Sequence, residues 1–222
     1  LPKQSGDVLP ETNVGSIVSV ADKVDTLVAN FGIGLIPTGS QDPHGLRRQT
    51  AGFIQIWLAN NWTFHFTQLL DGVIHLTEKR GILKRERAVV LEDVIHFVKL
   101  RLKNLLQEEG IRYDVIDAVL NGEISNVPVI FEKARFLNKQ LDNEEFKHVV
   151  EAFSRVTNIA KNVSSGGEVK EELLIEDEEV RLYRKKEEVE QVVSQHLQQG
   201  NIAEAFSELA ELKDEINDYF DH

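Results

Sequence analysis

Residues 37–48 read PTGSQDPHGLRR, and this segment decides how the rest of the chain is interpreted. It is a turn that opens a helix, because its two prolines and Gly39 exclude a continuous helix. Ser40 or Asp42 can accept hydrogen bonds from the first amides of the following helix, and Pro43 suits the first helical position. The segment therefore predicts a helix that begins near Pro43.

Arg47 and Arg48 fall within the first two turns of this predicted helix. The helix is indicated by apolar side chains at helical spacing, which are Leu46, Phe53, Ile54, Trp57 and Leu58. The helix dipole disfavours cations at this end. Two explanations are open: either nearby carboxylates offset the charge of the arginine pair, or the pair is held ready for an anion.

The same periodicity extends along most of the chain, whereas no stretch alternates in the manner of a strand. The other predicted helices cover residues 14–31, 64–76, 89–109, 113–120, 127–141, 143–163, 178–199 and 202–220. A Ser-Ser-Gly-Gly run at 164–167 predicts a flexible break. We therefore predict an all-α fold with two helical units, residues 1–110 and 111–222, divided near Gly110.

The formal net charge of the 222 residues is −12, and the charge is unevenly distributed. Residues 1–110 carry 12 Lys and Arg against 12 Asp and Glu, residues 111–163 carry 7 against 8, and residues 164–222 carry 6 against 17. The acidity thus belongs to the C-terminal segment, where charged helices ordinarily serve solubility. The remainder is balanced and can still present a local basic face to phosphate.

The sequence contains no cysteine, which excludes disulfides and thiolate metal sites. It shows no signal peptide, and no apolar run approaches the length of a membrane span, so we expect a cytoplasmic protein without membrane contact. The chain starts at Leu1 and contains no methionine, and we expect it to be a fragment of a longer protein.

Three motifs in the first half resemble one known family. The sequence ADKVDTLV runs from Ala21, FGIG follows from Phe31, and the PTGS turn leads into DPHGLRR. In order, spacing and identity these motifs resemble the β subunit of bacterial glycyl-tRNA synthetase. The resemblance implies a glycine–tRNA ligase of α2β2 type, in which the α subunit forms the adenylate with ATP and the β subunit holds tRNA(Gly). The fragment itself is then expected to be non-catalytic and to bind no cofactor.

The second half resembles the DALR-type anticodon-binding helical bundle, which also occurs in arginyl-tRNA synthetase. The similar motifs are DVIDAV at 114–119, FSRVTNI at 153–159 and NDYFD at 217–221. The resemblance covers residues 111–222 and implies that one or two further helices follow them. It also implies that this unit reaches the anticodon arm of the tRNA.

Basic residues supply the candidates for RNA contact. Arg155 and Asn158 lie three positions apart, with Lys161 one turn further, and such a strip on a helix suits phosphate or an unstacked base. The full set of candidates is Arg155, Asn158, Lys161, Arg135, Lys133, Arg47 and Arg48. The alternative is that Arg155 pairs with Glu151 or with an acidic neighbouring helix, and that Asn158 bridges backbone groups within the bundle.

Asp22 raises the alternative of a metal site. In the HD superfamily of metal phosphohydrolases, a late helical aspartate completes a site that upstream His and His-Asp elements begin, and the Ala-Asp-Lys motif at Asp22 resembles that late element. The upstream ligands are absent from this sequence, and its seven histidines show no metal-binding spacing. We expect a structural aspartate that helps to hold the arginine turn. The competing functions are an HD-type phosphohydrolase fragment and an acidic helical scaffold for a protein partner such as the α subunit.

Overall fold

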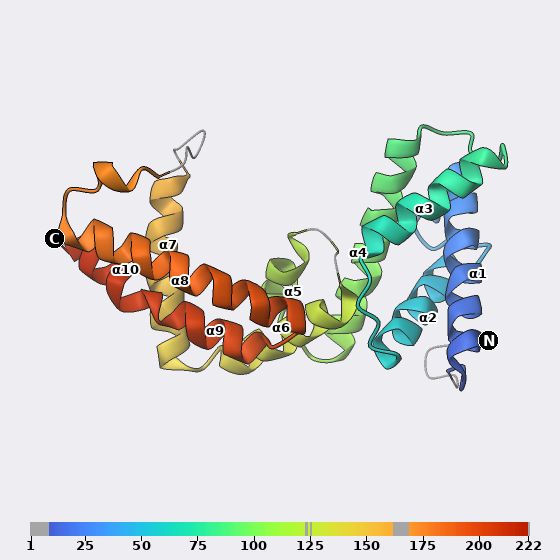
Figure 1. Cartoon of the computed structure of the whole chain (residues 1–222). Coiled ribbons are helices and arrows are strands. Elements are labelled where there is room, and N and C mark those ends of the chain that lie inside the picture. The colour runs from blue at the N-terminus through green and yellow to red at the C-terminus, as the bar shows by residue number, and fades with distance from the viewer. Residues whose placement is uncertain (1–8, 123, 125, 162–168, 222) are drawn as a thin grey trace. The chain divides into compact units, whose positions relative to one another are not determined.

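The computed structural model describes residues 9–122, 124, 126–161 and 169–221, and these residues are mainly helical (Figure 1). They contain no strand, and their only β-type pairing is an isolated bridge between Thr38 and Gln41. The all-α prediction is therefore confirmed. The flexible break predicted at 164–167 lies outside the described residues. Within the described part, no helix combines the length and the apolar character that crossing a bilayer requires.

The chain divides into two compact units, Leu1–Ala134 and Arg135–His222. The helices in chain order are α1 (Asn13–Gly32), α2 (Leu46–Ala59), α3 (Phe66–Lys79), α4 (Arg87–Glu108), α5 (Tyr113–Leu120), α6 (Val127–Gln140), α7 (Glu144–Ala160), the short 3₁₀ helix η1 (Glu171–Leu173), α8 (Asp177–Gln199), α9 (Ile202–Ala210) and α10 (Leu212–Asp221). The sequence indicated a boundary near Gly110, whereas α5 belongs to the first unit because it packs against α4. Lys103 of α4 and Asp117 of α5 form an ion pair of 2.8 Å between these two helices.

The core of the first unit lies where α1 packs against α2, α3 and α4. Among its largest fully buried side chains are the aromatic residues Phe31, Phe53, Trp57 and Phe66. The rings of Phe53 and Phe66 are stacked with centroids 5.9 Å apart, and Trp57 donates its indole N–H to the carbonyl oxygen of Trp62 at 2.7 Å. The apolar spacing in the sequence therefore marks the buried faces of these helices.

Lys23 of α1 is buried in the first unit, with only 4% of its surface exposed. Its Nζ donates a 3.0 Å hydrogen bond to Oγ of Ser19, one helical turn earlier. A Cβ atom on Gly52 would lie 3.3 Å from Cε of Lys23, so this glycine of α2 leaves space for the lysine stem. Burial lowers the pKa of Lys23 from its usual value of 10.5, and the charge of Asp22 opposes this with a smaller increase.

The second unit is a bundle in which α8 packs against α9 and α10, and α7 packs against α10. Its small apolar core consists of Ala152, Val189, Val193, Ala205, Leu212 and Ile216. α8 ends at Gly200, whose φ of 79° is a conformation that glycine adopts without strain. The prediction of one final helix over 202–220 was wrong. The N–H of Glu211 bonds to the carbonyl oxygen of Glu208 at 3.2 Å, which tightens and ends α9 before α10 begins.

Candidate nucleic-acid interface

The turn before α2 is closed by the carboxylate of Asp42. Its Oδ1 accepts the backbone N–H of Leu46 at 2.8 Å and its Oδ2 accepts that of Arg47 at 2.9 Å. The residue before the helix, Gly45, has a φ of 63° and provides no capping side chain. Of the two predicted capping residues, Asp42 is thus the one used, and Pro43 lies in the turn instead of opening the helix. The expected start at Pro43 was three residues too early because the chain turns once more, with the N–H of Gly45 bonded to the carbonyl oxygen of Asp42.

Arg47 folds back over this turn, while Arg48 stays exposed. The Nη2 of Arg47 donates to the carbonyl oxygen of Gly39 at 2.7 Å, and its Nη1 donates to that of Gln41 at 3.5 Å. The carboxylate of Asp42 lies at the same helix end, so it offsets the unfavourable position of the arginine pair. We had expected Asp22 to help to hold the arginine turn. Asp22 instead makes no hydrogen bond or ion pair with any residue that the structure describes.

A third arginine, Arg101 of α4, lies close enough to this turn to interact electrostatically with its charged residues. Burial and then the charge of Arg47 lower the pKa of Arg101, whereas Asp42 raises it. Its Nε is buried and has no hydrogen-bond partner among the described residues, and its guanidinium carbon lies 5.8 Å from the ring centroid of Phe97. Its neighbour Leu102 is fully buried on the apolar side of α4. The signal that would have revealed the role of Arg101 is its spacing of one turn from Phe97, which permits an arginine–aromatic contact.

A cavity of about 190 Å³ lies beside the arginine turn. It is lined by residues on both sides of the turn, which include Gly34, Ile36, Thr38, Asp42, His44 and Leu46. The first unit therefore combines a small hollow, which polar and apolar residues line together, with the guanidinium groups of Arg47 and Arg101 around one short segment. This arrangement can attract an anion, because arginine presents several donors in a fixed plane.

The arginines between the end of α3 and the first residue of α4 are held by carboxylates of the same unit. Arg80 contacts Asp25 at 3.1 Å and Arg85 contacts Asp93 at 2.6 Å, and Arg87 pairs with Asp71. The exposed residues Lys79 and Lys84 form no ion pair within the described part of the chain. The loop is therefore less positively charged toward solvent than its composition indicates.

In the second unit, Arg155 of α7 points into the bundle. Its Nη1 donates to Oδ1 of Asn217 and its Nη2 to Oδ1 of Asp221, both at 3.1 Å. The guanidinium carbon lies 4.5 Å from the ring centroid of Phe220. These contacts correspond to the alternative in which Arg155 pairs with an acidic neighbouring helix. Glu151 is not the partner.

Asn158 and Lys161 remain at the exposed end of α7, where Lys161 Nζ donates to Oδ1 of Asn158 at 3.0 Å. Lys133 is half-buried on α6, and Arg135 is exposed there and engaged with another residue. Residues two positions apart do not share a helix face, so Lys133 and Arg135 do not form a common strip. The structure thus brings Asn158 and Lys161 together but directs Arg155 to α10.

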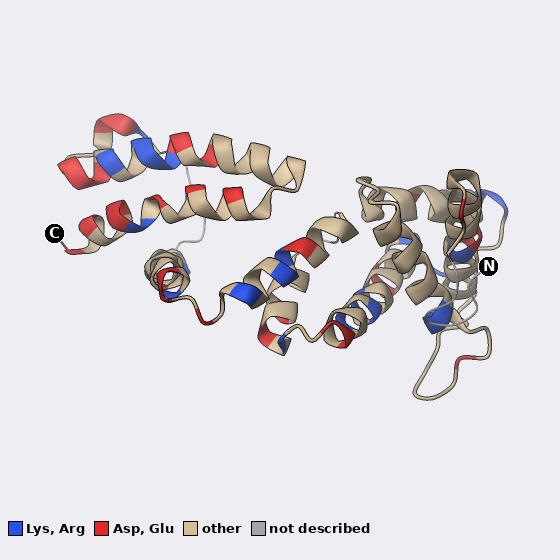
Figure 2. Ribbon diagram, turned by 90° about the horizontal axis from the view of Figure 1, so that it is seen from below, with Lys and Arg blue, Asp and Glu red and all other residues tan. Residues whose placement is uncertain are grey.

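The helices next to the C-terminus are strongly acidic, as the red segments in Figure 2 show. Their own cations are engaged with carboxylates in the same unit. These ion-paired residues are Arg181, Arg184, Lys185, Lys186 and Lys213. In the described part of this unit, Lys161 instead binds an amide oxygen, so its full charge is available to a ligand.

Metal-binding groups do not gather around Asp22. Within the described residues, no three His, Asp or Glu side chains lie close enough together to hold a metal ion. Asp25, one turn away, is occupied by Arg80. A single carboxylate does not make a cation site, so the residues present give the phosphohydrolase alternative no support.

Known protein families match residues in both units of the chain. The model of the glycyl-tRNA synthetase beta subunit family matches residues 1–121, and that of the DALR anticodon binding domain matches residues 149–222. The chain is 41% identical over 222 residues to the glycine–tRNA ligase beta subunit of Halalkalibacterium halodurans and 39% identical over 222 residues to that of Shouchella clausii. It is 38% identical over 221 residues to that of Natranaerobius thermophilus.

Each of these matches covers 100% of this chain and 32% of the relative, so the chain spans about a third of the length of the relatives that it matches. The matched segment is the C-terminal part of those proteins. Because one family model covers more than half of the chain and the relatives align with all of it, the chain belongs to the glycyl-tRNA synthetase beta subunit family.

Proposed function

We propose that this chain is the tRNA-binding portion of the beta subunit of a cytoplasmic glycine–tRNA ligase. The complete enzyme joins glycine to tRNA(Gly) with ATP, and the alpha subunit of an α2β2 assembly supplies the adenylate-forming centre. Residues 1–222 bind and position the tRNA and take part in no step of the bond chemistry. The observation that carries the proposal is the anticodon-binding match at residues 149–222, joined in one chain to the beta-subunit match at residues 1–121.

In the second unit, the RNA contact is proposed for the exposed end of α7. Asn158 offers an amide and Lys161 an ammonium group, and the apolar side chains of Val156 and Ile159 are exposed close by. A phosphate on the lysine with an unstacked base against apolar surface is a common mode of single-stranded RNA recognition. Arg155 supports this surface as a positioning residue, since it fixes α7 against α10. Lys133 and Arg135 of α6 stay separate candidates for contact with the RNA backbone, since they do not share a helix face.

In the first unit, the proposed contact is the arginine turn. Arg48 is exposed and free to reach a phosphate, while Arg47 and Arg101 raise the local positive potential around it. Such contacts fix the register of an RNA without reading its sequence. The two surfaces therefore have different tasks: the turn positions the backbone and the end of α7 approaches bases.

The test is the affinity of the full-length beta subunit for tRNA(Gly) as a function of salt concentration. Each phosphate neutralised by a cation lowers the slope of log K against log salt by about 0.7 to 0.9. A slope that corresponds to several phosphates supports the proposal. Absence of binding at low salt, with the beta subunit folded and bound to its alpha subunit, contradicts it.

The charge reversal K161E separates RNA binding from the function of a protein scaffold. RNA binding predicts weaker tRNA affinity with unchanged association of the alpha subunit. A scaffold function predicts the opposite pattern for reversals on the acidic helices α8 and α10. Both associations are measured on the same purified proteins, so a misfolded variant is recognised by the loss of both.

A further inference from the structure

Helix α1 carries a wide apolar stripe, and the first unit covers only part of it. The covered part supplies core residues such as Val20, Val24 and Leu27, which are at most 5% exposed. Along the uncovered edge of the stripe, Ile17 is 58% and Val18 is 61% exposed. A helix at the surface of a globular protein normally turns polar residues to solvent. The uncovered edge of the stripe is therefore a candidate contact surface for a partner.

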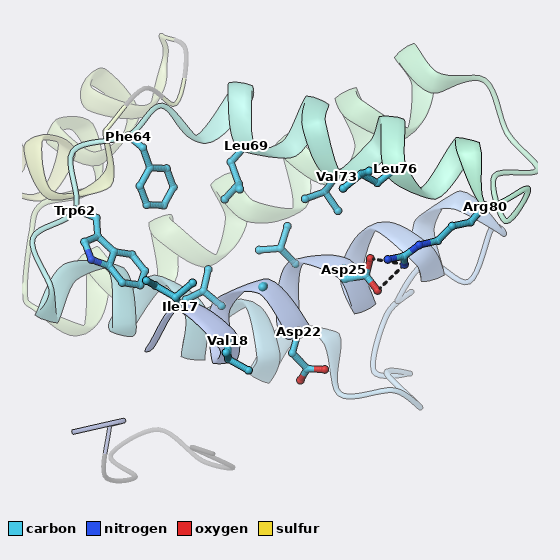
Figure 3. A pocket seen from close by; sticks show the side chains of 13 residues that line it. Ile17, Val18, Asp22, Asp25, Trp62, Phe64, Leu69, Val73, Leu76 and Arg80 are labelled. Atoms are coloured by element: carbon cyan, nitrogen blue, oxygen red, sulfur yellow. Dashed lines mark hydrogen bonds and ion pairs between the residues drawn. The ribbon is translucent and has the colours of Figure 1, made fainter. Parts of the chain in front are cut away.

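This edge of α1 forms one wall of an apolar groove of about 750 Å³ between α1 and α3 (Figure 3). The opposite wall carries Leu69, Val73 and Leu76 at positions i, i+4 and i+7 of α3, and Trp62 and Phe64 close one end. From residue 69 to residue 80 the rise along α3 is about 16 Å, which matches about three turns of another helix. The shape and the lining are those of a groove that receives an amphipathic helix.

Charged groups lie at the other end and along one side of the groove. Asp25 and Arg80 form an ion pair of 3.1 Å there, and Asp22 stands nearby without a hydrogen bond to any described residue (Figure 3). A partner with an apolar stripe and one cation or hydrogen-bond donor opposite Asp22 would complement both parts of the lining. The charged end also sets the register of the partner along the groove.

We propose that this groove is filled by a segment of the same polypeptide that precedes residue 1 in the full-length protein. The matched segment is the C-terminal part of relatives of which it makes up 32%, so about two thirds of such a polypeptide lies before it. The groove is built on α1, which begins at Asn13, so only twelve residues of sequence separate this helix from the chain that precedes residue 1. A tethered segment acts at an effective concentration in the millimolar range, which favours it over a separate molecule.

The test uses single cysteine variants of the full-length beta subunit, in which any cysteine outside residues 1–222 is first replaced by serine. Residues 1–222 contain no cysteine, so each variant adds one thiol to this region. V18C and L76C place the thiol on the two walls of the groove. H75C is the matched control, because His75 is exposed on α3, adjacent to Leu76 but outside the groove lining. All three positions are exposed in the first unit, so none of the substitutions disturbs its core.

Alkylation by iodoacetamide is timed for each native variant and, as a reference, for the same variant unfolded in guanidinium. We expect V18C and L76C to react at least about tenfold more slowly than H75C in the isolated beta subunit, because reaction requires local opening of the covering segment. This protection is expected to be independent of protein concentration and of added alpha subunit. Equal rates for the three variants would overturn the proposal.

A benzophenone maleimide attached to V18C identifies the occupant. We expect an intrachain photocrosslink to a peptide that lies before residue 1. A crosslink to a second beta subunit, to the alpha subunit or to a peptide after residue 222 would overturn the proposal, as would protection that appears only when a partner is added. The outcome does not depend on tRNA, so it stands or falls separately from the proposed function.

Discussion

Arg155 on α7 donates a 3.1 Å hydrogen bond to Asn217 on α10, across 62 positions of sequence. The same guanidinium reaches Asp221 and lies against the ring of Phe220. Three neighbouring residues of the last helix thus meet one side chain of α7. The contact makes Arg155 part of the framework of the second unit, even though the FSRVTNI motif that contains it resembles an anticodon-binding bundle.

The variant R155M should loosen α10 from α7. We expect a loss of about 1 kcal/mol, since a partly exposed cation–π contact and ion pair are each worth little but act together here. Hydrogen exchange of peptides from α7 and α10 should quicken. The fluorescence of the two tryptophans, Trp57 and Trp62, should not change, because both lie in the first unit. Unchanged exchange in α10 would contradict the framework role.

The variants K161A and R48A, at the proposed RNA contacts, should change tRNA binding and leave stability unchanged. We expect normal stability, tRNA(Gly) affinity reduced by about fivefold at low salt, and a salt slope smaller by about 1 for each variant. The measurement is a filter-binding titration at several salt concentrations. K79A is the control, since Lys79 is an exposed cation of the first unit outside the arginine turn. A salt slope identical to that of the wild type in both variants would remove these residues from the interface.

Replacing the capping carboxylate at Asp42 should weaken the start of α2. We expect D42A to lose about 1 to 2 kcal/mol of unfolding free energy, since two backbone N–H groups lose their acceptor and Arg47 loses the offsetting charge. D42N keeps an acceptor oxygen and should lose less. Guanidinium unfolding followed by tryptophan fluorescence reports this unit directly. Equal losses in D42A and D42N would show that the charge, and not the hydrogen bonds, is what matters.

Substitutions at Gly45 and Gly81 allow the effect of backbone strain to be measured separately from that of steric crowding. Gly45 and Gly81 both have a positive φ, of 63° and 70°, so G45A and G81A should each cost about 1 kcal/mol. A Cβ atom on Gly45 would also lie 3.1 Å from Nη2 of Arg48, whereas nothing lies within 4 Å at Gly81. We therefore expect G45A alone to displace Arg48 and to weaken tRNA binding. Thermal unfolding and tRNA titration of both variants provide the comparison.

Lys23 should make stability depend on pH in the alkaline range. Burial lowers its pKa in the folded state, while the unfolded state titrates near 10.5. Between these two pKa values the unfolded state binds more protons than the folded state. The unfolding free energy therefore rises with pH up to about pH 10.5. A tenfold change in the acid constant corresponds to about 1.4 kcal/mol. K23M should remove this rise and gain about 1 kcal/mol at neutral pH, because it no longer buries a charge. K79M, at an exposed lysine, should retain the rise.

The helices were predictable because their signals are local. The helix predicted over 89–109 corresponds to α4, and its residues Val90, Val94, Phe97 and Val98, which follow helical spacing, are all buried. Gly200 ends α8 where the sequence indicated. The start of α2 was missed because a second turn at Gly45 has no distinct signal when Pro43 already fits a helix start.

The candidate site was less predictable, because its residues are defined by distant partners. The asparagine and carboxylate that engage Arg155 lie 62 and 66 positions away. Arg101 was not among the candidates named from the sequence, and only the folded chain brings it under the influence of Arg47. Asp42 was named as a cap on local grounds, and that part of the site was confirmed.

The partly covered apolar stripe of α1 also bears on how sequence variation in this protein should be judged. Polar replacements at Ile17 or Val18 should leave the folding of residues 1–222 unchanged, because both side chains are exposed there. In a full-length protein whose groove is filled as proposed, the same replacements would place polar groups in a buried contact. Tolerance measured on residues 1–222 alone is therefore a poor guide to the effect of such substitutions on the full-length protein.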